Sequence, residues 1–546
     1  METKSLRGAD IVARSLERLG CRHVFTLSGN HIMSVFDAAL ETRLDLVHVR
    51  HEAAAVHMAD AWGRLTGEAG IAMVTGGPGH ANAVGALFTA LGAESPMVLL
   101  SGHAATWELG RGGFQEIRQA DMAAPVTKAS FTAASAATLG RDIGEAMRIA
   151  TSGRPGPVHL SLPSDLLEET VESNAIVWPD ARGASGVPAL AASVADAVLA
   201  EIASATRPII FAGPQLSNVS GRALLARLEA AAKAPAVILE SPRGIADATL
   251  GALSDIVQRA DLIVLLGKAL DFTTRWASGK GFDPNVRVIA IDPEAALVER
   301  AAKEMDGRLA LGSIADIRSA AETLIARAAA ARKRGDAWLI DARAALDNRP
   351  AAWTTITAQT PGRLHPAEVF RALRPYIERD PDTVLICDGG EFAQWGQSML
   401  PVRRRMINGV AGSIGGSLSF AIAARLKEPK APVFAVLGDG TIGFHISEFE
   451  TAVRRNLPFV AVLGNDALWN AESQIQLREY GKDRMHGCDL TPARYDRVVA
   501  ALGGHGEYVE NAADLPGAIE RALASGKPAC VNAMIESIAA PVIRLG

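Results

Sequence analysis

Residues 433–466 read VFAVLGDGTIGFHISEFETAVRRNLPFVAVLGND, and this stretch decides the fold class. Its two apolar runs, VFAVL and FVAVL, do not alternate apolar with polar residues, which is typical of strands buried on both faces of a sheet. The segment between them is long enough for a helix. Because a helix that joins two such strands makes them parallel, the stretch predicts a strand–helix–strand unit.

The same alternation of buried-strand and helix patterns recurs along the 546 residues of the chain. Apolar runs that end in Gly, Pro or Asp and precede Ala-rich helical patterns lie at 71–75, 96–102, 158–163, 207–214, 236–242, 261–267, 288–292, 384–390 and 529–535. A polar stretch near 170–190 and a charged stretch followed by a Pro/Thr-rich loop near 327–365 separate three groups of runs. We therefore expect an α/β protein of three doubly wound, parallel-sheet domains, over residues 1–172, 190–328 and 365–546.

Composition excludes several classes of function. Hydrophobic residues make up 49% of the chain and the formal net charge is −5, so we expect no basic surface for nucleic acid. No apolar string approaches the ~20 residues that span a bilayer, so we expect no membrane segment. The four cysteines show no CxxC spacing, which argues against a zinc site or a disulfide framework. These features predict a soluble, cytoplasmic protein whose partner is a small molecule.

Acidic residues end both strands of the opening stretch. Asp439 and Asp466 are 27 positions apart, one strand–helix–strand unit, so both strand tips should meet at one edge of the sheet. Gly438 and Gly440 let a ligand approach the backbone, and a helix beginning near Gly443 would direct its free N–H groups to the same place. Oxygen ligands beside a phosphate suit Mg²⁺. Gly-Asp-Gly alone could equally be a strand-to-helix turn, but the second acidic strand end favours a site.

These motifs resemble those of thiamine-diphosphate enzymes, in which Gly-Asp-Gly is followed about thirty residues later by Asn. The N-terminal third supplies the other half of the family's pattern, with VRHEAAAVHMADAWGRLTG at 49–67 and VTGGPGHANAVGALFTA at 74–90. The resemblance implies thiamine diphosphate and Mg²⁺ as cofactors, held at the pyrimidine end by the first domain and at the diphosphate end by the third. It also implies that Glu52 is the catalytic glutamate. Taken alone, Glu52 could be a surface residue favoured by the helix dipole.

Within that family, the chain is similar over essentially its whole length to the acetohydroxyacid (acetolactate) synthase-like branch, and its active-site motifs are most similar to those of benzaldehyde lyase and 2-hydroxyacyl-CoA lyase. GNHIMSVFDA places His31, and GGFQEIRQADMAAPVTK places Gln115, on active-site positions. The simpler interpretations are a histidine at a helix start and a glutamine in a loop. Ser164 stands where benzaldehyde lyase has a pocket tryptophan, which argues against an aromatic substrate.

The resemblance implies further site residues. Gly412 would bind the aminopyrimidine amine through its carbonyl, Ile414 would wedge the cofactor into its bent form, and Ala471 would line the substrate cavity. The implied cofactor-binding set is Glu52, Gly412, Ile414, Gly438, Asp439, Gly440, Thr441 and Asp466, and the implied metal ligands are Asp439, Asp466 and Leu468. The implied substrate pocket consists of His31, Gln115, Ser164 and Ala471. Asp466 occupies the position of the family's usual asparagine, so Asn465 is an alternative ligand.

The implied function is a carbon–carbon lyase or carboligase that forms or cleaves 2-hydroxy carbonyl compounds through an enamine at C2 of the cofactor. The alternatives within the family are a 2-hydroxyacyl-CoA lyase and a 2-oxo acid decarboxylase. The decarboxylase is weaker because those enzymes usually carry a histidine pair, and we expect no second histidine beside His31. Retention of Glu52, Asp439 and Gly440 disfavours a non-catalytic homologue, and a missing dinucleotide fingerprint disfavours a dehydrogenase.

Two further expectations come from the same family. Its members build each cofactor site from two subunits, so we expect at least a homodimer and favour a homotetramer. Relatives bind FAD or ADP in the central domain, at strand ends that correspond here to 267–272 and Asp292. Because this domain has no GxGxxG motif, a nucleotide there is not favoured, and Asp292 is expected to be a strand-end cap.

Overall fold

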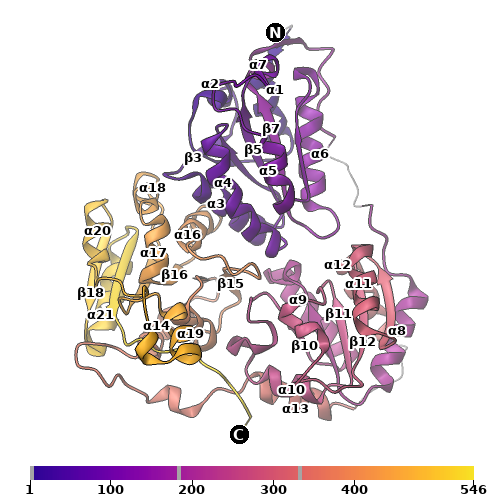
Figure 1. Cartoon of the computed structure of the whole chain (residues 1–546), viewed down its shortest axis with the longest axis vertical. Helices are drawn as coiled ribbons and strands as arrows, with labels where there is room; N and C mark the ends of the chain where they lie inside the picture. The colour runs from indigo at the N-terminus through magenta and orange to yellow at the C-terminus, as the bar shows by residue number, and fades with distance from the viewer. Residues whose placement is uncertain (1–4, 181–185, 330–334, 546) are drawn as a thin grey trace. The chain divides into compact units, whose positions relative to one another are not determined.

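The computed structural model describes residues 5–180, 186–329 and 335–545 of the chain. It is an α/β protein with three parallel sheets, one within each of the three expected domains (Figure 1). The fold class expected from the sequence is therefore confirmed. By compactness the chain divides into a first unit of 1–185, 418–428 and 447–455 and a second unit of 186–417, 429–446 and 456–546.

The first unit contains a six-stranded sheet in the order β3-β2-β4-β5-β7-β6, and all its pairs are parallel. The strands are β2 (His23–Thr26), β3 (Asp45–His48), β4 (Gly70–Val74), β5 (Met97–His103), β6 (Ala129–Thr132) and β7 (Pro157–Pro163). A short antiparallel pair, β1 (Ser5–Arg7) with β8 (Thr170–Glu172), stands beside it. Interior strands β4, β5 and β7 are buried along their whole length, as the unbroken apolar runs predicted.

Helices cover both faces of this sheet, as Figure 1 shows for α3 and α4 on one side and α6 on the other. The helices of the unit are α1 (Gly8–Arg18), α2 (Met33–Ala39), α3 (Glu52–Thr66), α4 (Pro78–Gly92), α5 (Gln119–Ala123), α6 (Leu139–Thr151), α7 (Ser164–Glu168), α16 (Ser417–Lys427) and α18 (Glu448–Arg454). Helix α3 has well-defined ends, since His51 Nδ1 accepts from the Ala53 N–H and Gly67 closes the helix at φ 77°. Glu52 is thereby fixed as the first residue of a helix.

The second unit contains two sheets. The central sheet has the order β10-β9-β11-β12-β13, with strands β9 (Pro208–Ala212), β10 (Ala236–Ile238), β11 (Leu262–Leu266), β12 (Arg287–Asp292) and β13 (Leu309–Ile314). Its helices are α8 (Ala192–Ser204), α9 (Val219–Ala232), α10 (Leu253–Arg259), α11 (Ala295–Met305), α12 (Ile317–Ala328) and α13 (Ala337–Leu346). Asp292 Oδ1 accepts from the Glu294 N–H, which is the capping role expected for it.

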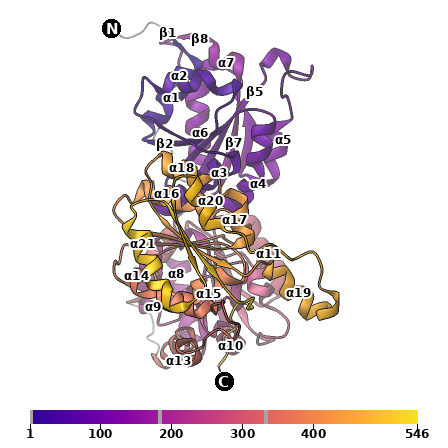
Figure 2. The same ribbon diagram turned by 90° about the vertical axis from the view of Figure 1, so that its left-hand side faces the viewer.

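The other sheet of this unit has the order β15-β14-β16-β17-β19-β18 and carries the acidic strand ends. Its strands are β14 (Val384–Cys387), β15 (Arg404–Ile407), β16 (Val433–Gly438), β17 (Val460–Asn465), β18 (His505–Val509) and β19 (Ala529–Met534). The helices are α14 (Pro366–Glu378), α15 (Glu391–Met399), α17 (Asp439–His445), α19 (Asn470–Tyr480), α20 (Tyr495–Ala501) and α21 (Leu515–Ala524). Figure 2 shows α19 at the margin of the unit.

One boundary differs from the expectation. The helix after β16 begins at Asp439 itself, four residues before Gly443, because Gly438 serves as its N-cap in an extended conformation and Thr441 Oγ1 accepts from the Gly438 N–H. No helix in the described ranges is both long and apolar enough to cross a membrane.

Candidate active site

Several polar residues of the first unit contact residues 75–82, which are the turn from β4 into α4 together with the first residues of that helix. We call this segment the turn 75–82. It carries two glycines before Pro78 starts the helix. Gly77 has φ 58°, and a Cβ there would lie only 2.4 Å from the Gln115 carbonyl oxygen. No side chain fits at this position, because the loop that contains Gln115 packs directly on the turn.

Glu52 reaches the same turn from α3. Its side chain is buried, and Asn82 Nδ2 donates to Glu52 Oε2 at 3.0 Å. A Cβ at Gly79 would lie 3.4 Å from Glu52 Oε1, so the second carboxylate oxygen faces the glycines of the turn. Glu52 is therefore a buried acid held by one amide, which contradicts the interpretation of a surface residue.

His31 approaches the turn from the other side. It lies in a short 3₁₀ helix after β2, is buried, and its Nδ1 is 3.1 Å from Thr75 Oγ1. Its ring stacks on Phe114, with centroids 5.9 Å apart and planes at 19°. Burial lowers the pKa of His31 below its ordinary value, so the imidazole is neutral at pH 7 and can accept a proton.

The structure thus brings the three expected catalytic residues of the first unit to one turn: Glu52 through Gly79 and Asn82, His31 through Thr75, and Gln115 through Gly77. Gln115 itself has φ 56°, an uncommon conformation for a residue with a side chain. Ser164 begins α7 directly after β7, and its neighbour Asp165 accepts a hydrogen bond from the Thr106 N–H at 2.9 Å rather than from this cluster.

His103, the last residue of β5, is a residue that the sequence analysis missed. It is buried, and burial lowers its pKa; Glu116 opposes this shift and His31 adds to it. Within the described residues, its Nδ1 is buried without a hydrogen-bond partner. Among the described residues no hydrogen bond or ring contact joins His103 to His31, so the expectation of no second histidine beside His31 stays a prediction. The sequence signal was a histidine at the carboxyl end of a buried strand, which periodicity alone cannot place beside another segment.

In the second unit, a cavity of about 70 Å³ gathers most of the residues expected to bind the cofactor. The expected residues that line it are Ile414, Gly438, Asp439, Gly440, Thr441, Asp466, Leu468 and Ala471. Two of its glycines pack closely against side chains that also line it: a Cβ on Gly440 would meet the Trp469 ring at 2.7 Å, and one on Gly464 would meet Phe392 at 2.4 Å. Only glycine therefore fits at these two positions.

The two acidic strand ends both line this cavity, and their carboxyl groups lie close enough to each other to interact directly. Burial raises the pKa of both carboxyl groups, and the charge of Asp439 raises the pKa of Asp466 further. Within the described part of the chain, Asp439 Oδ2 is buried and has no hydrogen-bond partner. A divalent cation would satisfy this oxygen and remove the repulsion, so the donor set fits Mg²⁺. The described residues include no cluster of three or more His, Cys, Asp or Glu suited to a metal, so backbone or cofactor oxygens would have to complete the shell.

Asn465, the alternative ligand, is engaged elsewhere. Its Nδ2 donates to the Ala493 carbonyl at 3.0 Å and to Asn532 Oδ1 at 3.2 Å, and its Oδ1 accepts from the Ala467 N–H at 3.3 Å. These bonds are those of a buried structural amide. The geometry therefore favours Asp466 over Asn465 as the partner of Asp439.

Asp388, which follows β14, is a second residue that the sequence analysis missed. It is buried, and its two carboxylate oxygens accept from the N–H groups of Gly389, Gly415 and Ser417 at 2.7–3.1 Å. It therefore fixes the loop that contains Gly412 and Ile414. Gly412 has φ 70°, and a Cβ on Gly389 would lie 2.5 Å from the Ile414 side chain, so the loop packs closely on the strand end.

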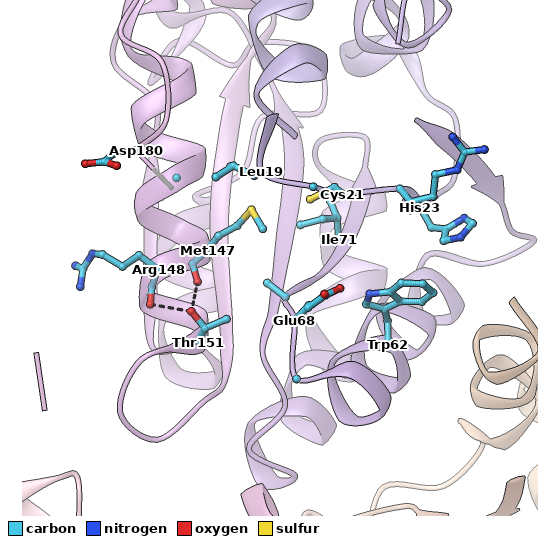
Figure 3. A pocket seen from close by; sticks show the side chains of 15 residues that line it. Leu19, Cys21, His23, Trp62, Glu68, Ile71, Met147, Arg148, Thr151 and Asp180 are labelled. Atoms are coloured by element: carbon cyan, nitrogen blue, oxygen red, sulfur yellow. Dashed lines mark hydrogen bonds between the residues drawn. The ribbon is translucent and has the colours of Figure 1, made fainter. Parts of the chain in front are cut away.

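A separate cavity of about 380 Å³ lies at the opposite edge of the first unit's sheet, where β2 and β4 begin (Figure 3). His23 and Trp62 meet edge to face at one end, and Met147, Arg148 and Thr151 of α6 form the other. Because Glu52 and His31 lie at the carboxyl edge of the sheet, this cavity is not part of the cluster described above.

Comparison with known proteins identifies the family to which the chain belongs. Residues 6–122 match the model of the thiamine pyrophosphate enzyme N-terminal TPP binding domain, and residues 388–533 match that of the C-terminal TPP binding domain. The acetolactate synthase large subunit IlvG of Mycobacterium tuberculosis is 31% identical, over 98% of this chain and 97% of that protein. The chain belongs to the thiamine pyrophosphate enzymes.

Other members of the thiamine pyrophosphate enzymes are similar along nearly the same length. The 2-hydroxyacyl-CoA lyase 2 of Caenorhabditis elegans is 28% identical over 98% of this chain and 90% of that protein. The human protein of the same name is 27% identical over 91% of this chain and 84% of that protein. Since both matched domains are cofactor-binding domains, thiamine diphosphate is the cofactor of this enzyme, and the resemblance seen in the motifs is confirmed.

Proposed function

We propose that this enzyme forms or cleaves 2-hydroxy carbonyl compounds, as a thiamine-diphosphate- and Mg²⁺-dependent carbon–carbon lyase or carboligase. The observation that supports the proposal is that Glu52, His31 and the loop of Gln115 all contact residues 75–82, so that an acid and an imidazole lie at one strand end and the backbone of Gln115 packs beside them. This is the chemistry needed to move protons on a carbonyl and a neighbouring hydroxyl.

The residues that would hold the metal and the diphosphate lie in the second unit. Asp439, Asp466 and Leu468 would hold Mg²⁺, and Gly438, Gly440 and Thr441 would hold the diphosphate. Gly412 and Ile414, on the loop that Asp388 fixes, would hold the pyrimidine and the bent conformation. When bound, thiamine diphosphate supplies an electron sink for carbon–carbon bond changes beside a carbonyl.

The chain's own residues would control the protons. Glu52 would hold a proton at its carboxyl group and exchange it with a ring nitrogen of the pyrimidine. Asn82 would keep that carboxyl in place through its bond to Oε2, while burial excludes water around it. His31, neutral at pH 7, would accept the proton of a substrate hydroxyl at Nε2, because Nδ1 lies against Thr75. Gln115 would orient the carbonyl, and Ser164 and Ala471 would line the pocket.

The assembly and location belong to the same proposal. We infer at least a homodimer, with a homotetramer favoured, in which the pyrimidine and diphosphate ends of each site come from different subunits. We place the enzyme in the cytoplasm, which agrees with four cysteines that form no disulfide. No nucleic acid or membrane partner is proposed, and nothing supports FAD or ADP in the central domain strongly enough to add it.

One other activity has specific support. Relatives named 2-hydroxyacyl-CoA lyase favour cleavage of a 2-hydroxyacyl thioester as the second candidate. Simple decarboxylation of a 2-oxo acid is the weaker alternative, because the sequence lacks the histidine pair usual in those enzymes.

The test is product analysis. The purified protein, with thiamine diphosphate and Mg²⁺, is incubated with pyruvate plus an acceptor aldehyde, with acyloins, and with a 2-hydroxyacyl-CoA. We expect carboligation or acyloin cleavage that slows in both His31→Ala and Gln115→Ala. Acetaldehyde as the only product, or unchanged rates in both variants, would contradict the proposal.

A further inference from the structure

A large cavity lies in the second unit, away from the cofactor-binding strand ends. Its volume is about 600 Å³. Its walls come from the segment after β10, the connection from α13 to α14, helix α14, and the end of α15 with the start of β15. The cavity of about 70 Å³ that contains Asp439 lies at the other end of α15, where it is lined by Gly389, Gly390 and Glu391. The cavity does not include residues 267–272 or Asp292, the positions that correspond to the nucleotide site of relatives.

Arginines dominate the polar wall of this cavity. Five line it: Arg222, Arg349, Arg371, Arg374 and Arg405. Four acids lie near them. Glu240 accepts from Arg222 at 2.6 Å and from Arg405 at 2.5 Å, and Glu378 accepts from Arg374 at 2.7 Å. Asp347 and Asp247 lie close to Arg349. The arginines therefore outnumber the acids around the cavity.

Two of these arginines are held in fixed positions by backbone carbonyls. Arg349 donates to four backbone carbonyls, those of Thr249, Leu346, Asn348 and Ser398, at 2.7–3.0 Å. Arg371 donates to the carbonyls of Trp353 and Ile356 at 2.8 and 2.7 Å. Within the described chain, no ion pair joins either of them to a carboxylate. Burial lowers the pKa of Arg349; the charges of Asp347 and Asp247 oppose this shift, and the charge of Arg405 adds to it.

Part of the remaining wall is apolar. It includes Leu250, Trp353, Met399, Leu400 and Val402, and the Trp353 ring packs against Trp395 with centroids 5.1 Å apart. The carbonyl bonds of Arg349 and Arg371 explain why the connection between α13 and α14 is ordered. These bonds do not explain why five arginine side chains surround a cavity beside an apolar wall. Guanidinium groups that are already held in place bind an anion with little loss of side-chain freedom.

We infer that this cavity is a binding site for a small organic anion, one whose carboxylate or phosphate faces the arginines while a compact apolar body packs on Trp353 and its apolar neighbours. The site is distinct from the one that binds the cofactor. Its occupant is therefore a second ligand of the enzyme, and this inference does not depend on which reaction the enzyme catalyses.

The experiment is isothermal titration of the holoenzyme, saturated with thiamine diphosphate and Mg²⁺. The probes are benzoate and phenyl phosphate, with benzyl alcohol and inorganic phosphate as controls that lack the charge or the apolar body. We expect one saturable site per chain for at least one probe, and much weaker binding of both controls. Comparison of the two probes tells a carboxylate ligand from a phosphate ligand.

Three variants locate the binding. Arg374→Gln removes an exposed guanidinium of the wall, and Val402→Asp places a carboxylate in the apolar part; each should weaken binding about tenfold or more, as expected for the loss of a charge-assisted hydrogen bond or for added repulsion. Arg379→Gln, an exposed arginine next to the same helix but outside the cavity wall, should leave it unchanged. Absence of saturable binding, or equal affinity in wild type, Arg374→Gln and Val402→Asp, would overturn the inference.

Discussion

At the scale of single residues, the most informative feature is the pair of acids at neighbouring strand ends. Two carboxylates buried together repel each other, and such an arrangement persists in a folded protein only when a proton or a cation neutralises it. Asp439 Oδ2 has no hydrogen-bond partner in the described chain, so one buried oxygen of the pair is left for a cation to satisfy. A cation site is the simplest physical explanation.

Replacement of these acids should separate their roles. Asp439→Ala should bind thiamine diphosphate at least about 100-fold more weakly even in excess Mg²⁺, because the metal and diphosphate lose their buried anionic ligand. Asp466→Asn keeps an oxygen ligand and removes the repulsion, so it should retain most of the affinity. The measurement is titration of the cofactor at fixed Mg²⁺. Wild-type affinity in Asp439→Ala would remove that residue from the site.

At the scale of elements, the important feature is that turns rather than strands hold the site residues. Asp388 fixes the loop 408–417 through the two backbone N–H groups of Gly415 and Ser417, and the turn 75–82 receives Glu52, His31 and Gln115 from three other segments. Each of these contacts joins segments far apart in sequence. Changes in such a contact should therefore disturb cofactor binding as well as stability.

The substitution Asp388→Ala tests whether cofactor binding and stability depend on the bonds from Asp388 to the loop 408–417. The substitution leaves buried N–H groups without an acceptor, so we expect a loss of about 3–5 kcal/mol in the stability of this unit and weaker cofactor binding, since Gly412 and Ile414 lie in the freed loop. Asp388→Asn, which keeps an acceptor oxygen, should lie between wild type and Asp388→Ala. Thermal unfolding and cofactor titration measure both effects. A normal cofactor affinity in Asp388→Ala would show that the loop does not depend on this clamp.

A buried histidine pair in the first unit predicts pH-dependent stability. The His80 and His159 rings lie 4.5 Å apart; burial lowers the pKa of His80 to about 4 and that of His159 well below its ordinary value. Because the unfolded chain binds these protons more tightly, stability should be complete above pH ~6.5 and fall as the pH drops toward ~4, by up to about 3 kcal/mol for His80.

Unfolding measured between pH 7 and pH 4.5 checks this prediction. His80→Asn, which can still hydrogen-bond to Ser101, should show a shallower loss of stability with falling pH. His486→Gln, which changes an exposed histidine, is the control and should follow wild type. An identical pH slope in His80→Asn and wild type would mean that His80 is not neutral in the folded protein.

Whether an element could be predicted depended on how fully it is buried. Strands such as β5 and β16 were evident because unbroken apolar runs reveal strands covered on both faces. Strands β6, β13, β15 and β18 were not, because they lie at sheet edges and their sequences alternate or are polar. The start of α17 was wrong by four residues, since glycine after a strand does not reveal which residue caps the helix.

The site was predictable where its residues belong to continuous motifs. Asp439, Asp466 and Glu52 could be identified because each is a strand end or a helix start next to a family motif. Asn82, His103 and Asp388 were missed because their roles come from contacts with distant segments, which no local pattern encodes. Other residues were assigned by resemblance alone, and all the assigned roles stay predictions: His31, Gln115, Ser164, Gly412, Ile414, Leu468 and Ala471.

At the scale of the whole molecule, the central feature is that Glu52 and the Asp439–Asp466 pair belong to different compact units. If two subunits share each site, mixing two inactive variants restores activity. Coexpressed Glu52→Gln and Asp439→Ala should regain about a quarter of wild-type activity, since half of randomly formed dimers are mixed and one of their two sites is intact. Each variant alone is the control. No recovery in isolated mixed dimers would place both halves of a site in one subunit.

The central claim, that this chain is a working thiamine-diphosphate enzyme with Glu52 as its proton-transferring acid, has one direct test. Exchange of the cofactor's C2 proton for deuterium can be followed by NMR on wild type and on Glu52→Gln, with cofactor occupancy checked in both. We expect similar cofactor binding and an exchange rate lower by about 10²–10⁴ in Glu52→Gln, the usual range for loss of a general acid–base group. Exchange at the wild-type rate in a fully loaded Glu52→Gln protein would contradict the claim.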